Sequence, residues 1–142
     1  MCCETVEYES MKSVTILIPT FNAMGWFRSS YAEFLEQDYA GAYDILVIDS
    51  GSTDGTVAFL QDQDRTTVHS IASEDFGHGN TRNLGAQLAK GDLVLMTVQD
   101  ARPPHSSWIT NMVQSLESQQ LDGLCGKQAV PSEEDKNPLQ WY

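Results

Sequence analysis

Apolar and polar positions divide the chain into short apolar runs, each followed by a polar loop and a segment of helical periodicity. The apolar runs are rich in β-branched residues and bounded by turn formers, which is the pattern of strands buried on both faces of a sheet. They lie at residues 14–18, 44–48, 66–71 and 93–97, with a fifth at 121–130. The segments with helical character lie at residues 26–37, 56–61, 80–89 and 106–117.

This alternation predicts an α/β domain with a mostly parallel sheet flanked by helices, because parallel strands need crossover connections and these are right-handed. At 142 residues the chain is long enough to bury one hydrophobic core. Ligands of such sheets bind beyond the carboxyl ends of the strands. The predicted site therefore comprises three polar segments, at residues 19–22, 49–54 and 98–102.

Two aspartates follow predicted strands. Asp49 comes directly after the second strand, where it either starts the turn of residues 50–55 or accepts hydrogen bonds from a base edge or ribose. Asp100 follows the fourth strand, and a carboxylate there suits a hard cation such as Mg²⁺ or Mn²⁺, which completes its shell with substrate phosphate oxygens. We expect the two carboxylates to lie at adjacent strand ends and to face one cleft. Asp54 has the setting of a helix N-cap.

The segment FGHGNTRN, residues 76–83, places two glycines around His78 just before a predicted helix. Arg82 then falls in the first turn of that helix, where a positive charge opposes the helix dipole. A bound anion would reverse this penalty, because Arg82 and the free first-turn N–H groups can both meet a phosphate. The alternative is an exposed arginine with an ion pair elsewhere. For His78, a role in the site and a role in capping or packing both stay open.

The charge balance narrows the choice of partners. The chain carries 8 Lys and Arg against 20 Asp and Glu, a formal net charge of −12, which excludes nucleic acid and anionic membrane as main partners. The cysteine count is odd and sparse, without zinc-ligand or redox spacing, and indicates a reducing, cytoplasmic compartment. Of the three cysteines, Cys125 is expected to be a small core residue. We expect no signal peptide and no transmembrane segment, since no apolar run approaches the ~20 residues that span a bilayer.

Several familiar nucleotide-site and nucleophile patterns are absent from the sequence. There is no G-x-x-x-x-G-K-[ST] of a P-loop, and no G-x-G-x-x-G after the first strand that would indicate a dinucleotide fold. No Ser/His/Asp set lies in a nucleophile elbow. The polar groups at the strand ends are therefore the remaining candidates.

Four blocks of sequence occur in order: VTILIPTFNA, DILVIDSGSTDGT, FGHGNTRNLGAQLAKGDLVLMTVQDARP and the following Trp108. Together they resemble the family 2 glycosyltransferases, which have the GT-A fold, and the HG-x-TRN and QDA variants are most similar to its rhamnosyltransferase-type members. The resemblance implies inverting transfer of a sugar from a nucleoside-diphosphate sugar to the hydroxyl of a glycan or lipid-linked acceptor. It also implies a role in polysaccharide or cell-surface glycan synthesis, with Mn²⁺ or Mg²⁺ as cofactor.

The resemblance also implies roles for individual residues. Asp49 would contact the base, and Arg82 would face the nucleotide. Residues 98–100 match the D-x-D metal motif, so that Asp100 would bind the metal and Gln99 would lie near the ribose. The backbone lining of the nucleotide pocket would come from Pro19, Thr20 and Asn22.

Two positions depart from the family pattern. Val98 occupies the first Asp position of D-x-D and leaves one clear carboxylate for the metal, and Ser50 replaces an acidic residue common after Asp49. Other classes stay as alternatives. A non-catalytic nucleotide-binding or interaction module could have kept the fold. A nucleotidyltransferase would need a glycine- and lysine-bearing loop after the first strand, and a receiver domain would need an acidic pair there.

The resemblance covers roughly residues 13–131, which we expect to form the nucleotide-sugar-binding domain. Residues 1–12 and 132–142 are expected to be an N-terminal and a C-terminal tail. Family members usually continue into a further half that holds the acceptor site and the general base. No residue here is a good candidate for that base. We therefore expect the chain to supply the donor- and metal-binding part without the acceptor half, in the cytoplasm or peripheral at the inner face of the membrane.

Overall fold

The computed structural model describes residues 11–126, which divide into two compact units, one up to Thr110 and one from Asn111 onward. The first unit contains every strand found among these residues. In chain order the elements are β1 (Val14–Thr20), α1 (Phe27–Leu35), β2 (Tyr43–Asp49), α2 (Thr56–Gln61), β3 (Thr66–Ser70), the 3-10 helix η1 (Ser73–Asp75), α3 (His78–Leu88), β4 (Leu93–Met96) and α4 (Trp108–Ser118).

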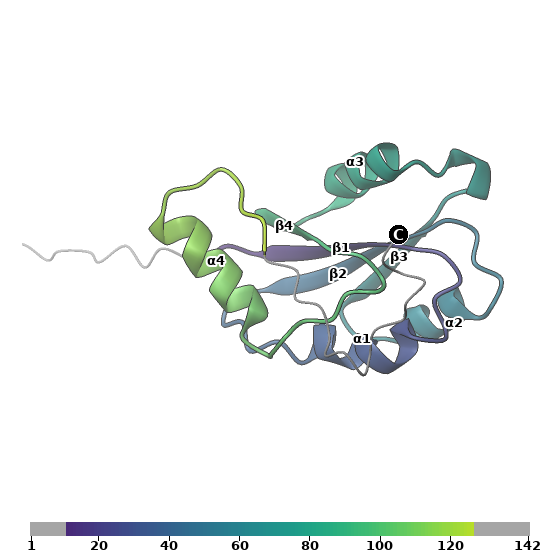
Figure 1. The fold of residues 1–142 in the computed structure, drawn as a ribbon, viewed down its shortest axis with the longest axis horizontal. Coiled ribbons are helices and arrows are strands. Elements are labelled where there is room, and N and C mark those ends of the chain that lie inside the picture. The colour runs from purple at the N-terminus through teal and green to yellow at the C-terminus, as the bar shows by residue number, and fades with distance from the viewer. Residues whose placement is uncertain (1–10, 127–142) are drawn as a thin grey trace, which may run out of the picture. The chain divides into compact units, whose positions relative to one another are not determined.

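The four strands form one parallel sheet in the order β3-β2-β1-β4. Helices α1 and α2 cover one face of this sheet and α3 covers the other (Figure 1). The predicted α/β domain with a parallel sheet flanked by helices is thereby confirmed. Because β1 lies between β2 and β4, the prediction that Asp49 and Asp100 follow adjacent strands is wrong.

Strand β1 runs two residues beyond the predicted end at Ile18, and Pro19 lies inside it. A proline cannot donate to a sheet ladder, so it is confined to places where no acceptor is waiting. Strand β1 pairs with β4 only as far as Leu17, whereas it pairs with β2 through Thr20. Since Leu17 accepts from Thr97 on the β4 side, Pro19 faces that same side beyond the last pair and costs no hydrogen bond.

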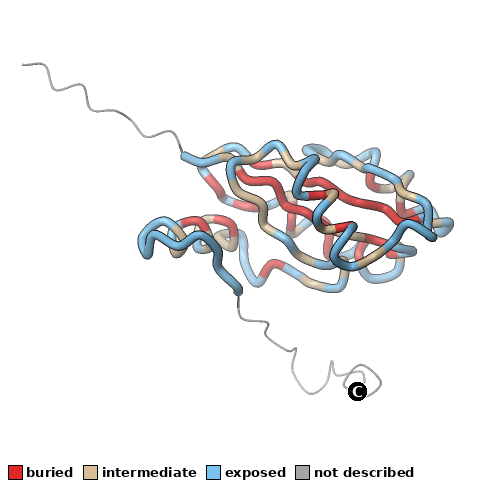
Figure 2. The backbone as a smooth tube through the Cα atoms, turned by 90° about the horizontal axis from the view of Figure 1, so that it is seen from above, coloured by how far each residue is buried: buried red, intermediate tan, exposed pale blue. Residues whose placement is uncertain are grey.

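The core lies on the two central strands. Ile16, Leu17 and Ile18 are each 0% exposed, so β1 is buried on both faces as predicted. Figure 2 shows buried positions running along the central strands, with exposed positions mainly in the outer segments. The prediction of a buried fourth strand is wrong, because β4 is the edge strand of the sheet formed by residues 11–126 and its residues are half-buried or, at Met96, exposed.

The chain after α4 departs from the prediction in its described part. Residues 121–126 contain no strand, and residues 127–130, the rest of the predicted fifth strand, lie outside the described residues. Cys125 is exposed, which contradicts its predicted place in the core. A short apolar stretch alone does not separate a strand from an extended loop.

Helix α3 packs on β1 through Gly85, which is buried. A Cβ at Gly85 would lie 2.6 Å from Leu17 Cδ2 and closer still to Cδ1, and Leu17 is fully buried. We expect Gly85→Ala to lower the free energy of unfolding by about 1–2 kcal/mol, since overpacking costs more than the helix propensity gained. The control is Gly79→Ala in the same helix, where a Cβ meets nothing within 4 Å. Urea denaturation should show this variant at or above wild-type stability, and equal stability of both variants would contradict the packing argument.

Candidate functional site

The loops that follow β1 and β2 are bound to each other at the carboxyl edge of the sheet. The Thr20 carbonyl oxygen accepts from both the N–H and the hydroxyl of Ser50, each at 3.0 Å. Asn22 has a left-handed backbone (φ 46°), which asparagine tolerates, and its Oδ1 accepts from the Thr53 N–H at 2.8 Å. The Asn22 N–H donates to Ser52 Oγ at 2.8 Å. Two of the predicted pocket residues therefore fix the shape of this edge.

Asp49 is buried, 1% exposed, and holds the loop after β2. Its Oδ2 accepts from the N–H groups of Gly51 and Ser52, each at 3.1 Å, and its Oδ1 accepts from the Ser52 hydroxyl. This is the turn-forming arrangement that was one of the two alternatives for this residue. A contact between Asp49 and a base stays a prediction.

Asp54 also bridges the two loops, from an exposed position. Its Oδ1 accepts from the N–H and the hydroxyl of Thr56, at 3.0 and 2.6 Å, and its Oδ2 accepts from the Met24 N–H at 3.0 Å. The hydrogen bond from Thr56 is the largest of the causes that lower the pKa of Asp54. Asp54 thus meets the first N–H of α2, although the N-cap position itself is Gly55.

Gln99 joins the loop after β4 to the end of β1. Its Oε1 accepts from Thr20 Oγ1 and from the Phe21 N–H, both at 2.8 Å, and its Nε2 donates to the Phe21 carbonyl at 3.3 Å. The amide side chain therefore bonds to the backbone of Phe21 much as a neighbouring strand would. Its predicted place near a ribose stays a prediction.

Asp100 lies beyond the end of β4, in a turn closed by the hydrogen bond from the Ala101 N–H to the Val98 carbonyl at 3.1 Å. It is exposed, and no residue of the described range 11–126 bonds to its carboxylate. The same range holds no group of three or more His, Cys, Asp or Glu side chains that could bind a metal ion. Asp100 therefore offers a single free carboxylate, in contrast to Asp49.

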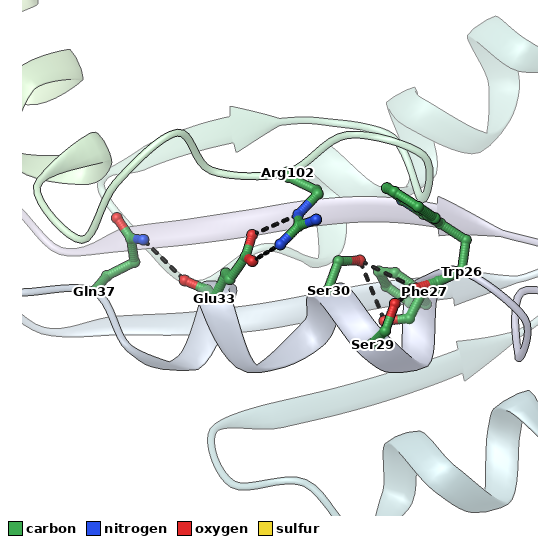
Figure 3. A network of polar contacts seen from close by, with 7 residues as sticks. All are labelled: Trp26, Phe27, Ser29, Ser30, Glu33, Gln37 and Arg102. Carbon is green, nitrogen blue, oxygen red and sulfur yellow. Dashed lines mark hydrogen bonds and ion pairs between the residues drawn. The ribbon is translucent and has the colours of Figure 1, made fainter. Parts of the chain in front are cut away.

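The sequence reasoning missed an ion pair that holds this loop. Arg102 donates to Glu33 of α1 through two nitrogens, with Nε to Oε2 at 3.0 Å, and its guanidinium lies over the Trp26 ring at 5.6 Å (Figure 3). The hydrogen bond from Arg102 lowers the pKa of Glu33, and the same bond raises the pKa of Arg102. A pair this far apart in sequence leaves no periodic signal.

The N-terminus of α3 is open. The helix begins at His78, so Arg82 lies in the second turn rather than in the predicted first turn. Its side chain turns back, however, and Nη1 donates to the His78 carbonyl at 2.9 Å, which returns the charge to the first turn. No side chain caps this helix, and the predicted alternative of an ion pair for Arg82 is not found among the residues described.

A second side chain, that of Thr81, also makes a local bond at this helix start. Thr81 Oγ1 accepts from the Gly77 N–H at 3.3 Å. His78 is exposed and packs edge-on against the Phe76 ring, with 5.1 Å between ring centroids. This contact is of the packing kind that was one of the alternatives for His78. The first-turn N–H groups of α3 have no acceptor in the described part of the chain.

The arrangement is that of a parallel α/β sheet whose carboxyl edge carries an open helix start with an arginine, a free carboxylate and tightly bonded loops. A sequence model of the family described as glycosyl transferase family 2 matches residues 15–140. The chain therefore belongs to glycosyl transferase family 2, and its fold is GT-A.

Two curated relatives share this sequence at length. The chain is 35% identical over 127 residues to the O-antigen chain rhamnosyltransferase RfbN of Salmonella typhimurium, which covers 89% of this chain and 40% of the relative. It is 27% identical over 130 residues to the O-antigen chain rhamnosyltransferase WbaN of Salmonella anatum, covering 91% of this chain and 40% of the relative. The chain thus spans about 40% of the length of both relatives.

Solved structures share the fold. The mannosyltransferase PcManGT of Pyrobaculum calidifontis, in complex with GDP-Man and Mn²⁺, is 28% identical with a TM-score of 0.66, covering 74% of this chain and 32% of that one. TarS of S. aureus in complex with UDP has a TM-score of 0.69 at 18% identity, covering 87% of this chain and 40% of that one, and shows the fold alone. In the described residues no helix has both the length and the apolar character to cross a membrane.

Proposed function

We propose that this chain is the donor-binding part of a glycosyltransferase that transfers a sugar, with inversion, from a nucleoside-diphosphate sugar to an acceptor hydroxyl. The observation that carries the proposal is the match of residues 15–140 to the family. The similarity to two O-antigen rhamnosyltransferases supports a glycan or lipid-linked acceptor in cell-surface glycan synthesis. The proposed location is cytoplasmic, or peripheral at the inner face of the membrane.

The diphosphate has a suitable partner in the N-terminus of α3. Free first-turn N–H groups and the positive end of the helix dipole attract anions, and the Arg82 guanidinium lies beside them. An arginine can also donate two parallel hydrogen bonds to a phosphate. In a chain with a net charge of −12, the start of α3 and Arg82 thus supply positive polarity that an anionic donor needs.

The carboxylate of Asp100 fits a divalent metal only as one ligand among several. Magnesium-type sites in proteins use one or two carboxylates and take their other ligands from substrate phosphates and water, so a single free carboxylate suffices. When bound, Mn²⁺ or Mg²⁺ would supply positive charge to the diphosphate leaving group. Asp100 would hold this charge next to the nucleotide. Inversion also needs a general base, and we assign none within residues 11–126.

We expect Asp100→Asn to lower the manganese-dependent gain in nucleotide affinity about tenfold, the lower end of what even indirect changes at metal sites cost. Asparagine keeps the size of the side chain but removes the charge that attracts the cation. Titration calorimetry with GDP, UDP and dTDP, each with and without manganese, measures this gain. The fold should persist, because Asp100 is exposed. An unchanged gain in the variant would remove Asp100 from the metal site.

The alternative is a non-catalytic nucleotide-binding or interaction module that kept the fold, and the same titrations test the interaction module, which would bind no nucleotide. A panel of dTDP-, UDP- and GDP-sugars identifies the base, because a donor site prefers one of the three nucleotides. Failure of all three to bind the wild-type chain, in the presence of manganese, would favour the interaction module.

A further inference from the structure

The segment between β4 and α4, residues 97–107, is bonded to α1 and to residues 37 and 38 just beyond the end of that helix. Arg102 pairs with Glu33, and the buried side chain of Gln37, two residues beyond the end of α1, donates to the His105 carbonyl at 3.3 Å. The Asp38 N–H donates to the Ser106 carbonyl at 2.9 Å. Figure 3 shows Arg102 reaching from this segment to Glu33 on α1.

Asp100 lies between two anchored neighbours in this segment. On one side Gln99 bonds to Thr20 and to the backbone of Phe21 at the end of β1. On the other side Arg102 bonds to Glu33. Asp100 itself has no bond to another of the described residues, so its position depends on these two anchors.

The Arg102 anchor is built for orientation rather than for stability. Its side chain is 50% exposed and that of Glu33 is 31% exposed, and ion pairs at such places contribute little to the free energy of unfolding. The two-nitrogen geometry, however, fixes the direction of the guanidinium, and the Trp26 ring limits its movement from a second side.

We propose that Arg102 and Glu33 are a positioning pair that holds residues 97–103 against the end of β1. The pair thereby sets how tightly Asp100 binds the metal and, through the metal, how tightly the chain binds the nucleotide. The binding part of this inference rests on the proposed function. Arg102 acts through Asp100 and does not itself contact the nucleotide.

Hydrogen exchange of the ligand-free chain tests the positioning step. The Phe21 N–H, bonded to Gln99 Oε1 at 2.8 Å, and the Ala101 N–H, bonded to the Val98 carbonyl, report the two sides of Asp100. In Arg102→Ala and in Glu33→Ala both amides should exchange roughly fivefold faster, as expected for loss of one exposed but well-oriented pair. The internal reference is the N–H of Ile71, which follows β3 and donates to the Asp49 carbonyl at the end of β2, and its exchange rate should not change.

Two further variants sharpen this comparison. Exchanging the partners, Glu33→Arg with Arg102→Glu, should restore most of the protection, which a loss of packing alone would not allow. Arg28→Ala is the matched control. Arg28 lies in α1 and, like Arg102, is an exposed arginine over an aromatic ring, in this case that of Phe59 at 5.8 Å. Unchanged protection of both amides in Arg102→Ala would overturn the inference, whatever the nucleotide does.

Calorimetry then tests the binding step, with GDP, UDP and dTDP in the presence and absence of manganese. Arg102→Ala should reduce the manganese-dependent gain in affinity by roughly the same fivefold. Added to Asp100→Asn it should cause no further loss, because a positioning residue acts only through the group it positions. A further loss of affinity in that double variant would overturn the inference and indicate that Arg102 contacts the nucleotide directly. If the wild-type chain binds none of the three nucleotides, the proposed function fails, whereas the exchange rates still decide whether the pair holds the segment.

Discussion

Asp49→Ala should lower the free energy of unfolding by about 3 kcal/mol, since hydrogen bonds to a charged acceptor contribute about 1.5–3 kcal/mol each. The carboxylate is buried and accepts from the N–H groups of Gly51 and Ser52 and from the Ser52 hydroxyl. Gly51 is exposed, so water replaces part of what is lost and the full sum of the three bonds is not expected. A loss of this size is a large share of the ~5–15 kcal/mol by which domains are stable.

The matched variant is Asp49→Asn. Its amide oxygen can keep the two backbone bonds at Gly51 and Ser52, while its NH₂ group can donate to the Ser52 hydroxyl, so the loss should be only about 1 kcal/mol. Urea denaturation of both variants measures the difference. If both lose the same amount, the charge of Asp49 matters more than its place in the turn. If Asp49→Asn keeps its stability but changes the choice between GDP, UDP and dTDP, the carboxylate serves the base as well.

The central strands could be predicted from the sequence because both of their faces are buried. Continuous apolar runs around Ile16 and Leu46 carry that signal, and the observed strands exceed the predicted ones only at their ends. Strand β4 was predicted with the right position but the wrong burial. Its order in the sheet, at the edge beside β1, depends on pairing between distant segments, which the local pattern does not contain.

The same limit applies to the candidate site. The rule that ligands of parallel sheets bind beyond the carboxyl ends of the strands selected the positions of Asp49, Gln99 and Asp100. Their partners did not follow from it. Gln99 bonds to Phe21, and Arg102 to Glu33, across long separations in sequence, and each bond depends on how the loops fold over the edge of the sheet. Side chains that hold loops in this way are visible only in three dimensions.

Arg82→Ala should weaken binding of the preferred nucleoside diphosphate by about 1.5–3 kcal/mol, the range for a charge-assisted hydrogen bond. This corresponds to roughly a tenfold to hundredfold rise in the dissociation constant. The Arg82 guanidinium lies beside the first turn of α3, where its charge and the dipole repel each other until an anion binds. The stability of the free chain should therefore change by less than about 0.5 kcal/mol, as for most exposed sites, because the variant loses one hydrogen bond and also that repulsion.

Two control variants separate charge, geometry and general electrostatics in this prediction. Arg82→Lys keeps the charge but loses the planar fork, so its binding should fall between wild type and Arg82→Ala. Lys90→Ala removes an exposed cation just beyond the other end of α3 and should bind normally, since salt screens a charge so far from the helix start. Calorimetry gives the affinities and thermal melting gives the stabilities. An Arg82→Ala variant that binds every nucleotide as wild type does, yet melts at a clearly lower temperature, would make Arg82 a structural residue, because its bond to the His78 carbonyl would then be its main role.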